Sequence, residues 1–192
     1  MKRSSFFKAI SGVIALSVLP IKNFAEILTI SQNKKGFQVK ADSDRFNKPV
    51  TLFEGDTFYT KISTKDTNGD LYMYESTRVK KGGPIMHFHY AQDEVWFITE
   101  GEFLIKVGEE TYQAKTGDTV FGPRGIPHSF TKMSEGNAKM IITFQPAGKM
   151  EEFFIAVAEG KMKNTTPEQQ EAIRRAHGFQ STGEGIGYLK KF

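Results

Sequence analysis

Three of the four histidines in this chain fall into one spaced pattern with a glutamate, and this pattern constrains the fold. His87 and His89 are two residues apart, Glu94 follows after four intervening residues, and His128 lies thirty-four positions further on. Histidines two apart on a β-strand point to the same side, with α-carbons about 7 Å apart, so both can reach one ion. The pattern predicts that His87, His89, Glu94 and His128 together form a metal site.

The residue types in this pattern suit a divalent transition metal. Neutral imidazoles and a carboxylate bind Fe, Mn, Co, Ni, Cu or Zn. Four such ligands leave a position for water, dioxygen or substrate when the ion is five- or six-coordinate. The alternative is a metal-free barrel in which the histidines are ordinary polar residues and Glu94 is a solvated carboxylate at a strand end.

The middle of the chain, residues 36–144, consists of short β-rich runs separated by glycine, proline and asparagine. These runs predict an antiparallel sandwich or barrel. Residues 57–63 and 71–79 are expected to form a hairpin, because the intervening Thr-Asn-Gly-Asp at 67–70 favours a turn. Small barrels of this kind hold a ligand inside.

Two later segments refine the barrel prediction. Apolar residues alternate along residues 102–107, so we expect three side chains to face inward, namely Phe103, Ile105 and Val107. The Pro-Arg-Gly turn at 123–125 is expected to place His128 at the start of a strand, and residues 139–144 to close the sheet.

After Gly148 the spacing of apolar residues changes from that of a strand to that of a helix. Apolar residues recur at helical spacing, and we interpret them as a packing face, namely Met150, Phe153, Phe154 and Val157. Residues 166–169, Thr-Pro-Glu-Gln, are typical of a capping box that starts a second helix, which is expected to end at Gly178. His177 falls in its last turn, where a cation meets the negative helix end, so we exclude it from the site.

The N-terminus predicts export. Residues 1–8 carry Lys2, Arg3 and Lys8 without an acidic residue, and residues 9–21 form an apolar run of signal-peptide length. This run is too short to span a membrane comfortably. Cleavage is expected after Ala25, and the start faintly resembles a twin-arginine signal without the second arginine. The alternative is an apolar helix packed on the domain or a retained anchor.

Charge and composition exclude some classes of binding partner. Residues 1–25 hold four basic and no acidic residues, so their removal lowers the formal charge from +4 to zero. The apparent basicity therefore comes from the signal, and nothing indicates nucleic-acid binding, which would need a basic patch on the mature domain. The chain has no cysteine, which excludes disulfides and thiolate ligands. Its 192 residues suit one domain.

The glycines and prolines around the ligands carry a family resemblance. Residues 83–94, closing at Gly101, resemble the first motif of the cupin superfamily. The second motif follows at the spacing of the compact form of the family, with Gly117, Pro123, Gly125 and His128. Two positions depart from the pattern: Lys81 stands where the opening glycine is expected, and Lys132 replaces the closing asparagine. Neither position carries a predicted ligand.

A finer resemblance extends over about residues 42–192, which are similar to small single-domain cupins of the quercetin dioxygenase (quercetinase) type. The shared features include Gly-Asp-Thr-Val at 117–120 and Pro-Arg-Gly-Ile-Pro-His at 123–128. The resemblance implies that His87, His89, Glu94 and His128 ligate the metal. It also implies that Glu94 takes the enolic proton of a flavonol before dioxygen cleaves the ring.

These observations together predict an exported, all-β cupin with a double-stranded β-helix, or jelly-roll barrel, and C-terminal helices. Residues 1–25 are the expected signal and 26–192 the single domain, with the barrel core at about 50–146 and a helical extension at 147–192. We expect a metal-dependent dioxygenase for a small enolic or aromatic substrate. A non-catalytic metal-dependent binding cupin and a cupin isomerase or lyase stay open. The expected partners are a small-molecule substrate and dioxygen. We expect no nucleic acid and no stable membrane anchor after processing. A homodimer is compatible with the sequence.

The export hypothesis makes a direct prediction about maturation. The mature protein should begin near Glu26 and lack the four basic residues of the signal, because signal peptidase removes the apolar segment during export to the periplasm or the medium. Mass spectrometry of the N-terminus of the exported fraction measures this. Soluble cytoplasmic protein that retains Met1 would instead indicate a structural N-terminal segment.

Overall fold

The structure of the protein is a computed structural model that describes residues 35–52 and 56–188. The chain divides into two compact units, residues 1–38 and residues 39–192. Of the first unit the structure describes residues 35–38, which have no regular secondary structure. The predicted export signal, residues 1–25, lies outside the described residues, so it stays a prediction.

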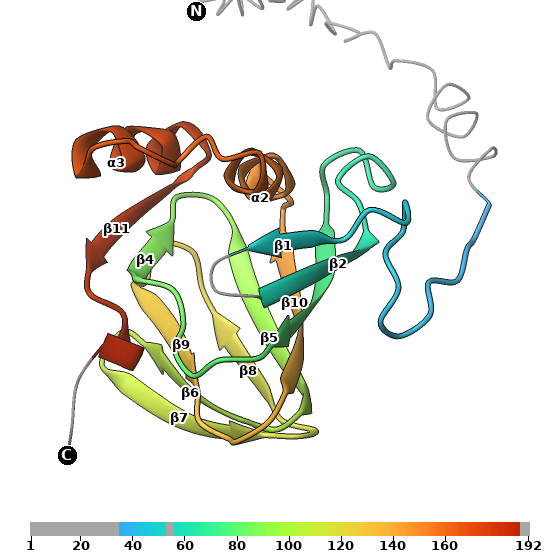
Figure 1. The fold of residues 1–192 in the computed structure, drawn as a ribbon, viewed down its shortest axis with the longest axis horizontal. Helices are drawn as coiled ribbons and strands as arrows, with labels where there is room; N and C mark the ends of the chain where they lie inside the picture. The colour runs from blue at the N-terminus through green and yellow to red at the C-terminus, as the bar shows by residue number, and fades with distance from the viewer. Residues whose placement is uncertain (1–34, 53–55, 189–192) are drawn as a thin grey trace, which may run out of the picture. The chain divides into compact units, whose positions relative to one another are not determined.

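The strands of the second unit form two antiparallel sheets (Figure 1). Within the described residues, the larger sheet has six strands in the order β1 (Val50–Leu52), β2 (Asp56–Ile62), β3 (Tyr72–Arg78), β10 (Ala138–Gln145), β5 (Asp93–Glu100) and β8 (Thr119–Gly122). The smaller sheet there has five strands in the order β11 (Phe179–Gly183), β4 (Met86–His89), β9 (His128–Lys132), β6 (Glu102–Val107) and β7 (Glu110–Lys115). This arrangement confirms the predicted all-β jelly roll.

The strand predictions agree with the structure. Strands β2 and β3 form the expected antiparallel hairpin, and β9 begins at His128, as the preceding turn predicts. Phe103 and Ile105 of β6 are buried, and Val107 is partly buried against the core. The predicted closing strand is β10, which lies between β3 and β5.

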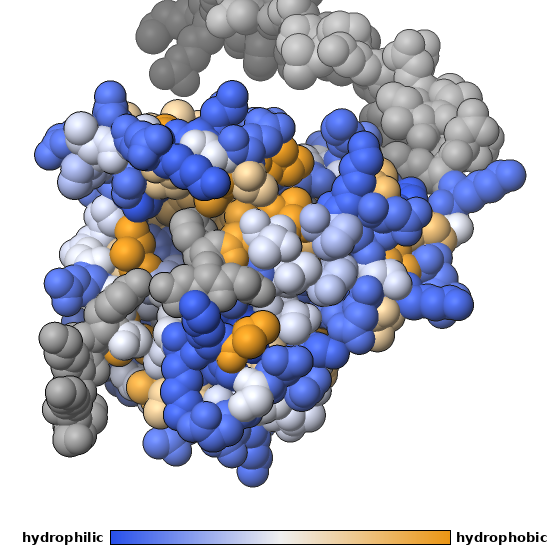
Figure 2. All heavy atoms as spheres, viewed as in Figure 1, coloured by the Kyte–Doolittle hydropathy of each residue, from blue (hydrophilic) through white to orange (hydrophobic). Residues whose placement is uncertain are grey.

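The core fills the space between the two sheets. Because side chains alternate across a strand, each strand sends every second residue inward. The largest fully buried apolar side chains come from β5, β6 and β10, namely Trp96, Ile98, Phe103, Ile105, Met140, Ile142 and Phe144. Burying each contributes roughly 1.5–3 kcal/mol to folding. Figure 2 shows hydrophilic side chains over most of one face of this unit, with some apolar side chains among them.

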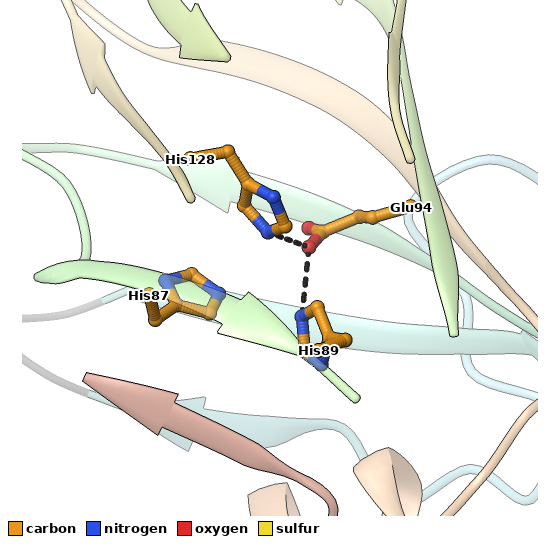
Figure 3. Close-up of side chains that lie close together, drawn as sticks. All are labelled: His87, His89, Glu94 and His128. Carbon is orange, nitrogen blue, oxygen red and sulfur yellow. Dashed lines mark hydrogen bonds and ion pairs between the residues drawn. The ribbon is translucent and has the colours of Figure 1, made fainter. Parts of the chain in front are cut away.

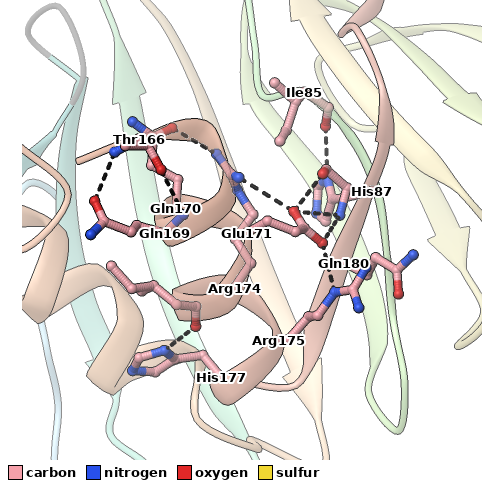
Figure 4. A network of polar contacts seen from close by, with 12 residues as sticks. Ile85, His87, Thr166, Gln169, Gln170, Glu171, Arg174, Arg175, His177 and Gln180 are labelled. Atoms are coloured by element: carbon pink, nitrogen blue, oxygen red, sulfur yellow. Dashed lines mark hydrogen bonds and ion pairs between the residues drawn. The ribbon is translucent and has the colours of Figure 1, made fainter.

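Two helices follow the barrel strands. In α2 (Met150–Ala158), Met150 and Phe153 are buried, and the Phe154 ring lies 5.0 Å from the Phe58 ring, which confirms the packing face. In α3 (Pro167–Ala176), the Thr166 side chain accepts from the Gln169 backbone N–H, and the reciprocal bond completes the predicted capping box (Figure 4). No helix among the described residues is long and apolar enough to cross a membrane.

The C-terminal segment contributes more than the predicted helices. Strand β11 pairs with β4, with Phe179 opposite His89, and a short 3-10 helix, η2 (Ile186–Tyr188), follows it. Glu171 of α3 accepts hydrogen bonds from the backbone N–H and hydroxyl of Ser181. Residues 147–192, expected to be helical, therefore also supply a strand next to the histidines.

The position of α2 depends on one carboxylate, which yields a stability prediction. Glu151 Oε2 accepts hydrogen bonds from Ser63 Oγ at 2.9 Å and from the Thr64 backbone N–H at 2.8 Å. We expect Glu151→Ala to lower the free energy of unfolding by about 1–3 kcal/mol, because it removes charged hydrogen bonds. Urea denaturation measures this. Glu152→Ala, an exposed neighbour in the same helical turn, is the matched control, and equal losses in both variants would contradict the assignment.

Candidate metal centre

The four predicted ligands come from strands of both sheets. His87 and His89 lie on β4 and His128 on β9 of the smaller sheet, where His87 and His128 are cross-strand partners. Glu94 lies on β5 of the larger sheet. All four side chains point into the space between the sheets and toward one another (Figure 3). The site therefore forms only when the sheets face each other.

The geometry of this cluster is close enough for one ion. One ligand atom from each residue lies within 4.8 Å of those of the other three. The histidine ring centroids are 4.7 to 5.4 Å apart. His89 and His128 are fully buried, Glu94 is 3% exposed, and His87 is 8% exposed. His87 is thus the ligand nearest to solvent.

Backbone carbonyls set the tautomers of two rings. His87 Nδ1 lies 2.8 Å from the Ile85 carbonyl oxygen, and His128 Nδ1 lies 3.0 Å from that of Ile126. A carbonyl only accepts, so Nδ1 carries the proton and donates it in both rings. The lone pair is left on Nε2 of each ring. Metal-binding histidines are oriented in this way by the hydrogen bond of the other ring nitrogen.

The contact with Glu94 tests whether a cation fits here. Glu94 Oε2 lies 3.1 Å from His89 Nε2 and 3.0 Å from His128 Nε2 (Figure 3). A neutral His128 that donates from Nδ1 has only a lone pair at Nε2, and this lone pair would face the lone pairs of the carboxylate. A cation or a proton between these atoms removes the repulsion. A divalent ion would satisfy three rings and the carboxylate at once, so the residues fit a metal.

The electrostatics of the cluster favour the protonation states that a metal site needs. Burial, followed by the neighbouring His128 and His89, lowers the pKa of His87 to about 3. Burial alone would raise the pKa of Glu94, but hydrogen bonds donated to Oε2 by His128 and His89, where their Nε2 atoms carry a proton, outweigh burial and hold this pKa well below its usual range. His87 is therefore neutral and Glu94 charged at neutral pH, as ligands must be.

Aromatic side chains enclose the cluster. The Phe179 ring lies 5.6 Å from His87 and 5.5 Å from His89, Phe144 lies 5.1 Å from His89, and Trp96 lies 5.2 Å from His128. Behind Phe179, Phe153 of α2 is in contact at 4.7 Å. These rings keep bulk water away and lower the local dielectric, which strengthens interactions between charged groups.

The sequence pattern by itself does not indicate a site role for these aromatic residues. Phe144 ends the predicted closing strand, residues 139–144, whereas Trp96 lies in the β-rich stretch without a strand predicted around it, so alternation was an available signal for Phe144 alone. Phe179 follows the end of α3, and no periodic pattern there indicated that a strand pairs with β4. Gly122 was also missed: it pairs with Glu94, and a Cβ there would lie 2.5 Å from Trp96 Cη2. Glycine thus lets β8 approach the site closely.

His177 lies outside the cluster, as expected. It caps the C-terminus of α3, and its Nδ1 lies 2.7 Å from the Ile173 carbonyl oxygen (Figure 4). Its ring contacts Phe153 at 5.5 Å. This position agrees with its interpretation as a helix-terminal residue.

Comparison with known proteins shows what this domain is similar to. Residues 76–144 match the family model described as a cupin domain. An uncharacterised protein of Streptomyces coelicolor is 40% identical over 57 residues, which are 30% of this chain and 53% of that protein. An uncharacterised protein of Methanocaldococcus jannaschii is 29% identical over 62 residues, which are 32% of this chain and 50% of that protein. The matches thus span about half the length of each relative.

Solved structures share the fold at low sequence identity. An RmlC-like cupin from Shewanella frigidimarina has a TM-score of 0.51 at 20% identity, covering 61% of this chain and 96% of that chain. KdgF from Halomonas sp. has a TM-score of 0.50 at 18% identity, covering 58% of this chain and 94% of that chain. These similarities agree with the cupin jelly roll and leave the reaction open.

The cluster predicts metal content that depends on the histidines. We expect about one transition-metal ion per chain, and His87→Ala or His128→Ala should lower occupancy at least tenfold, because each removes one of four ligands. Elemental analysis after reconstitution with each divalent ion measures this. His177→Ala is the matched control and should retain full occupancy. Wild-type protein that stays metal-free with every ion would refute the metal site.

Proposed function

Residues 76–144 match the family model of a cupin domain, and on this premise we propose that the protein is a metal-dependent enzyme. It binds one divalent transition ion through His87, His89, Glu94 and His128. It uses dioxygen to cleave a small enolic or aromatic substrate, with a flavonol as the leading candidate. The observation that carries the proposal is the buried cluster of three histidines and one glutamate with two preset ring tautomers.

The donor set supports redox-active ions. Three imidazoles and one carboxylate suit Fe, Mn, Co, Ni or Cu as well as Zn. An ion held by these four residues would supply Lewis-acid chemistry toward a substrate oxygen or dioxygen. Four protein ligands leave this position free when the ion is five- or six-coordinate.

Glu94 is the residue proposed to accept the substrate proton. It is a carboxylate at neutral pH, because its contacts with His128 and His89 hold its pKa low. The two histidines also fix the direction of Oε2, so a proton on an enolic oxygen bound at the centre has one defined acceptor. The base is thus already oriented before substrate binds.

The surroundings of the cluster support an aromatic or similarly flat substrate. Phe144 and Phe179 pack directly on the ligating rings, and Phe154 of α2 forms a second layer 6.4 Å from Phe144. Ligand sites in proteins are mostly apolar, with a few placed polar groups that set orientation. Here the metal ligands supply the polar groups and the phenylalanines the apolar wall.

The proposal predicts that substitution of Glu94 affects turnover far more than metal binding. Glu94→Gln should reduce turnover about a hundredfold or more while metal is retained, because three histidines still hold the ion and the proton acceptor is lost. Oxygen uptake by metal-loaded protein with flavonols and other enolic compounds measures turnover, alongside metal content. Glu102→Gln, on an exposed position of β6, is the matched control.

The same screen separates this proposal from its alternatives. Equal rates in Glu94→Gln and wild type would assign Glu94 a structural role. Substrate conversion without oxygen uptake would indicate an isomerase or lyase. Ligand binding that disappears in the metal-free protein, with no conversion of any compound, would indicate a binding cupin.

A further inference from the structure

His89 differs from the other two histidines of the cluster in the surroundings of its second ring nitrogen. His87 Nδ1 and His128 Nδ1 each lie within hydrogen-bond distance of a backbone carbonyl. His89 Nδ1 is buried and has no hydrogen-bond partner among the described residues, although Nε2 of the same ring lies 3.1 Å from Glu94 Oε2. Buried polar atoms without a partner are rare in folded proteins, so this one needs an explanation.

A second buried atom without a partner lies in the turn that follows His89. Gln92 is three residues further along the chain, between β4 and β5, and it is 3% exposed. Its Oε1 atom has no hydrogen-bond partner among residues 35–52 and 56–188. An amide oxygen only accepts hydrogen bonds, so Gln92 Oε1 requires a donor. A donor would stabilise the fold, because a buried acceptor that stays unpaired costs free energy.

Two glycines hold the Gln92 amide in place. A Cβ at position 148 would lie 1.6 Å from Gln92 Nε2, and a Cβ at position 178 would lie 3.2 Å from it. Gly148 and Gly178 also have positive φ angles, +55 and +91, which residues with a side chain rarely adopt. Near Gly148 the Nε2 atom is closest and Oε1 is farther away than Cγ. The oxygen of the amide therefore points away from Gly148.

The pairing of β11 with β4 brings this amide to the end of the strand that carries His89. Tyr90 donates its backbone N–H to the Gly178 carbonyl at 2.9 Å, and the following residue, Phe179, is the cross-strand partner of His89. The Gln92 amide, beside Gly178, thus lies close to the last residue pair of these strands. Figure 3 shows one ring nitrogen of His89 facing Glu94 and the other facing away from the cluster.

We propose that Gln92 is a positioning residue for the metal centre, whose Oε1 accepts a hydrogen bond from His89 Nδ1 when His89 Nε2 binds the ion. A neutral imidazole carries a single proton. An ion bound at Nε2 requires the lone pair there, so the proton is carried by Nδ1, which then needs an acceptor. The inference rests on metal binding by the cluster, as the proposed function does, and is independent of the reaction with dioxygen.

The proposed bond gives both unpartnered atoms a partner at once. When His89 Nε2 carries the ring proton, it donates to Glu94 Oε2, and His89 Nδ1 and Gln92 Oε1 both have only lone pairs. Two acceptors do not bond to each other. Transfer of the ring proton to Nδ1 changes the pair into a donor and an acceptor. Gln92 thus favours the tautomer of His89 that can bind an ion.

Gln92 would complete the support of the three ligating rings. The carbonyls of Ile85 and Ile126 hold the rings of His87 and His128, and the Gln92 side chain would hold the third. Partners of this kind orient a ligating ring and raise its basicity, and their loss commonly weakens metal binding roughly 10- to 100-fold. A side-chain acceptor, unlike a backbone carbonyl, can be removed by substitution.

Zinc titration of the purified full chain, by competition with a chromophoric chelator, tests this role. Gln92→Met preserves the length of the side chain and removes the acceptor, so we expect zinc affinity to fall at least about tenfold. Gln92→Glu retains an acceptor and should bind zinc almost as tightly as wild type. A role in packing alone predicts the opposite order, because methionine suits a buried position better than a carboxylate does.

Gln180→Met is the matched control for the titration. Gln180 lies on β11, next to β4, and accepts a hydrogen bond from the exposed Tyr90 hydroxyl at 3.1 Å. Its replacement should leave zinc affinity unchanged, because this side chain supports no ligating ring. Near-ultraviolet circular dichroism confirms that each variant is folded.

NMR of the zinc-loaded protein with ¹⁵N-labelled histidine detects the proposed bond itself. The Nδ1–H proton of His89 should exchange slowly with water in wild type and in Gln92→Glu, and faster in Gln92→Met. The Nδ1–H protons of His87 and His128 should be unaffected, because backbone carbonyls accept them. The His89→Gln variant identifies the His89 signal by its loss.

Several results would overturn the proposal. Equal zinc affinity and equal exchange in wild type and Gln92→Met would exclude the role of Gln92 alone, and weaker binding by Gln92→Glu than by Gln92→Met would indicate packing. Fast exchange of His89 Nδ1–H in wild type would exclude the bond even where Gln92→Met fails to fold. Wild type that binds no ion would instead overturn the metal centre, and this inference with it.

Discussion

The contact of the Glu94 carboxylate with His89 and His128 is the interaction on which the rest of the structure depends. Glu94 belongs to the larger sheet and the histidines to the smaller one, so this contact joins the two halves of the barrel. Burying a carboxylate costs several kcal/mol unless a cation or hydrogen bonds compensate it. The histidines, or an ion held between them, are therefore required for the sheets to close around the carboxylate.

The surrounding residues keep this polar cluster in one geometry. The carbonyls of Ile85 and Ile126 set the ring tautomers, while Phe144 and Phe179 pack on the ring faces. Gly122 leaves room for Trp96 beside His128. A site held in this way has its ligands oriented before an ion or a substrate arrives, which lowers the entropic cost of binding.

The departures from the cupin motifs affect the loops next to the site. Lys132, which stands where the motif has asparagine, is 2% exposed and donates to the carbonyls of Val79 and Gly136. Gly82, next to the expected glycine position, has φ +118, a conformation that residues with a side chain rarely adopt. A lysine and a displaced glycine thus connect the loop before β4 to the end of β9, and the ligand positions are unaffected.

The sequence by itself determined the strands, the helix caps and the four candidate ligands, because these follow from local rules. Strand alternation predicts the buried Phe103 and Ile105, the capping box predicts α3, and the His-x-His spacing predicts one ligand face. Only the tertiary structure decided that β11 pairs with β4 and places Phe179 on the histidines. It also decided which side chains surround Glu94. These features arise from contacts between segments far apart in the chain, and the energies of such contacts depend on how the sheets pack rather than on any local pattern of residues.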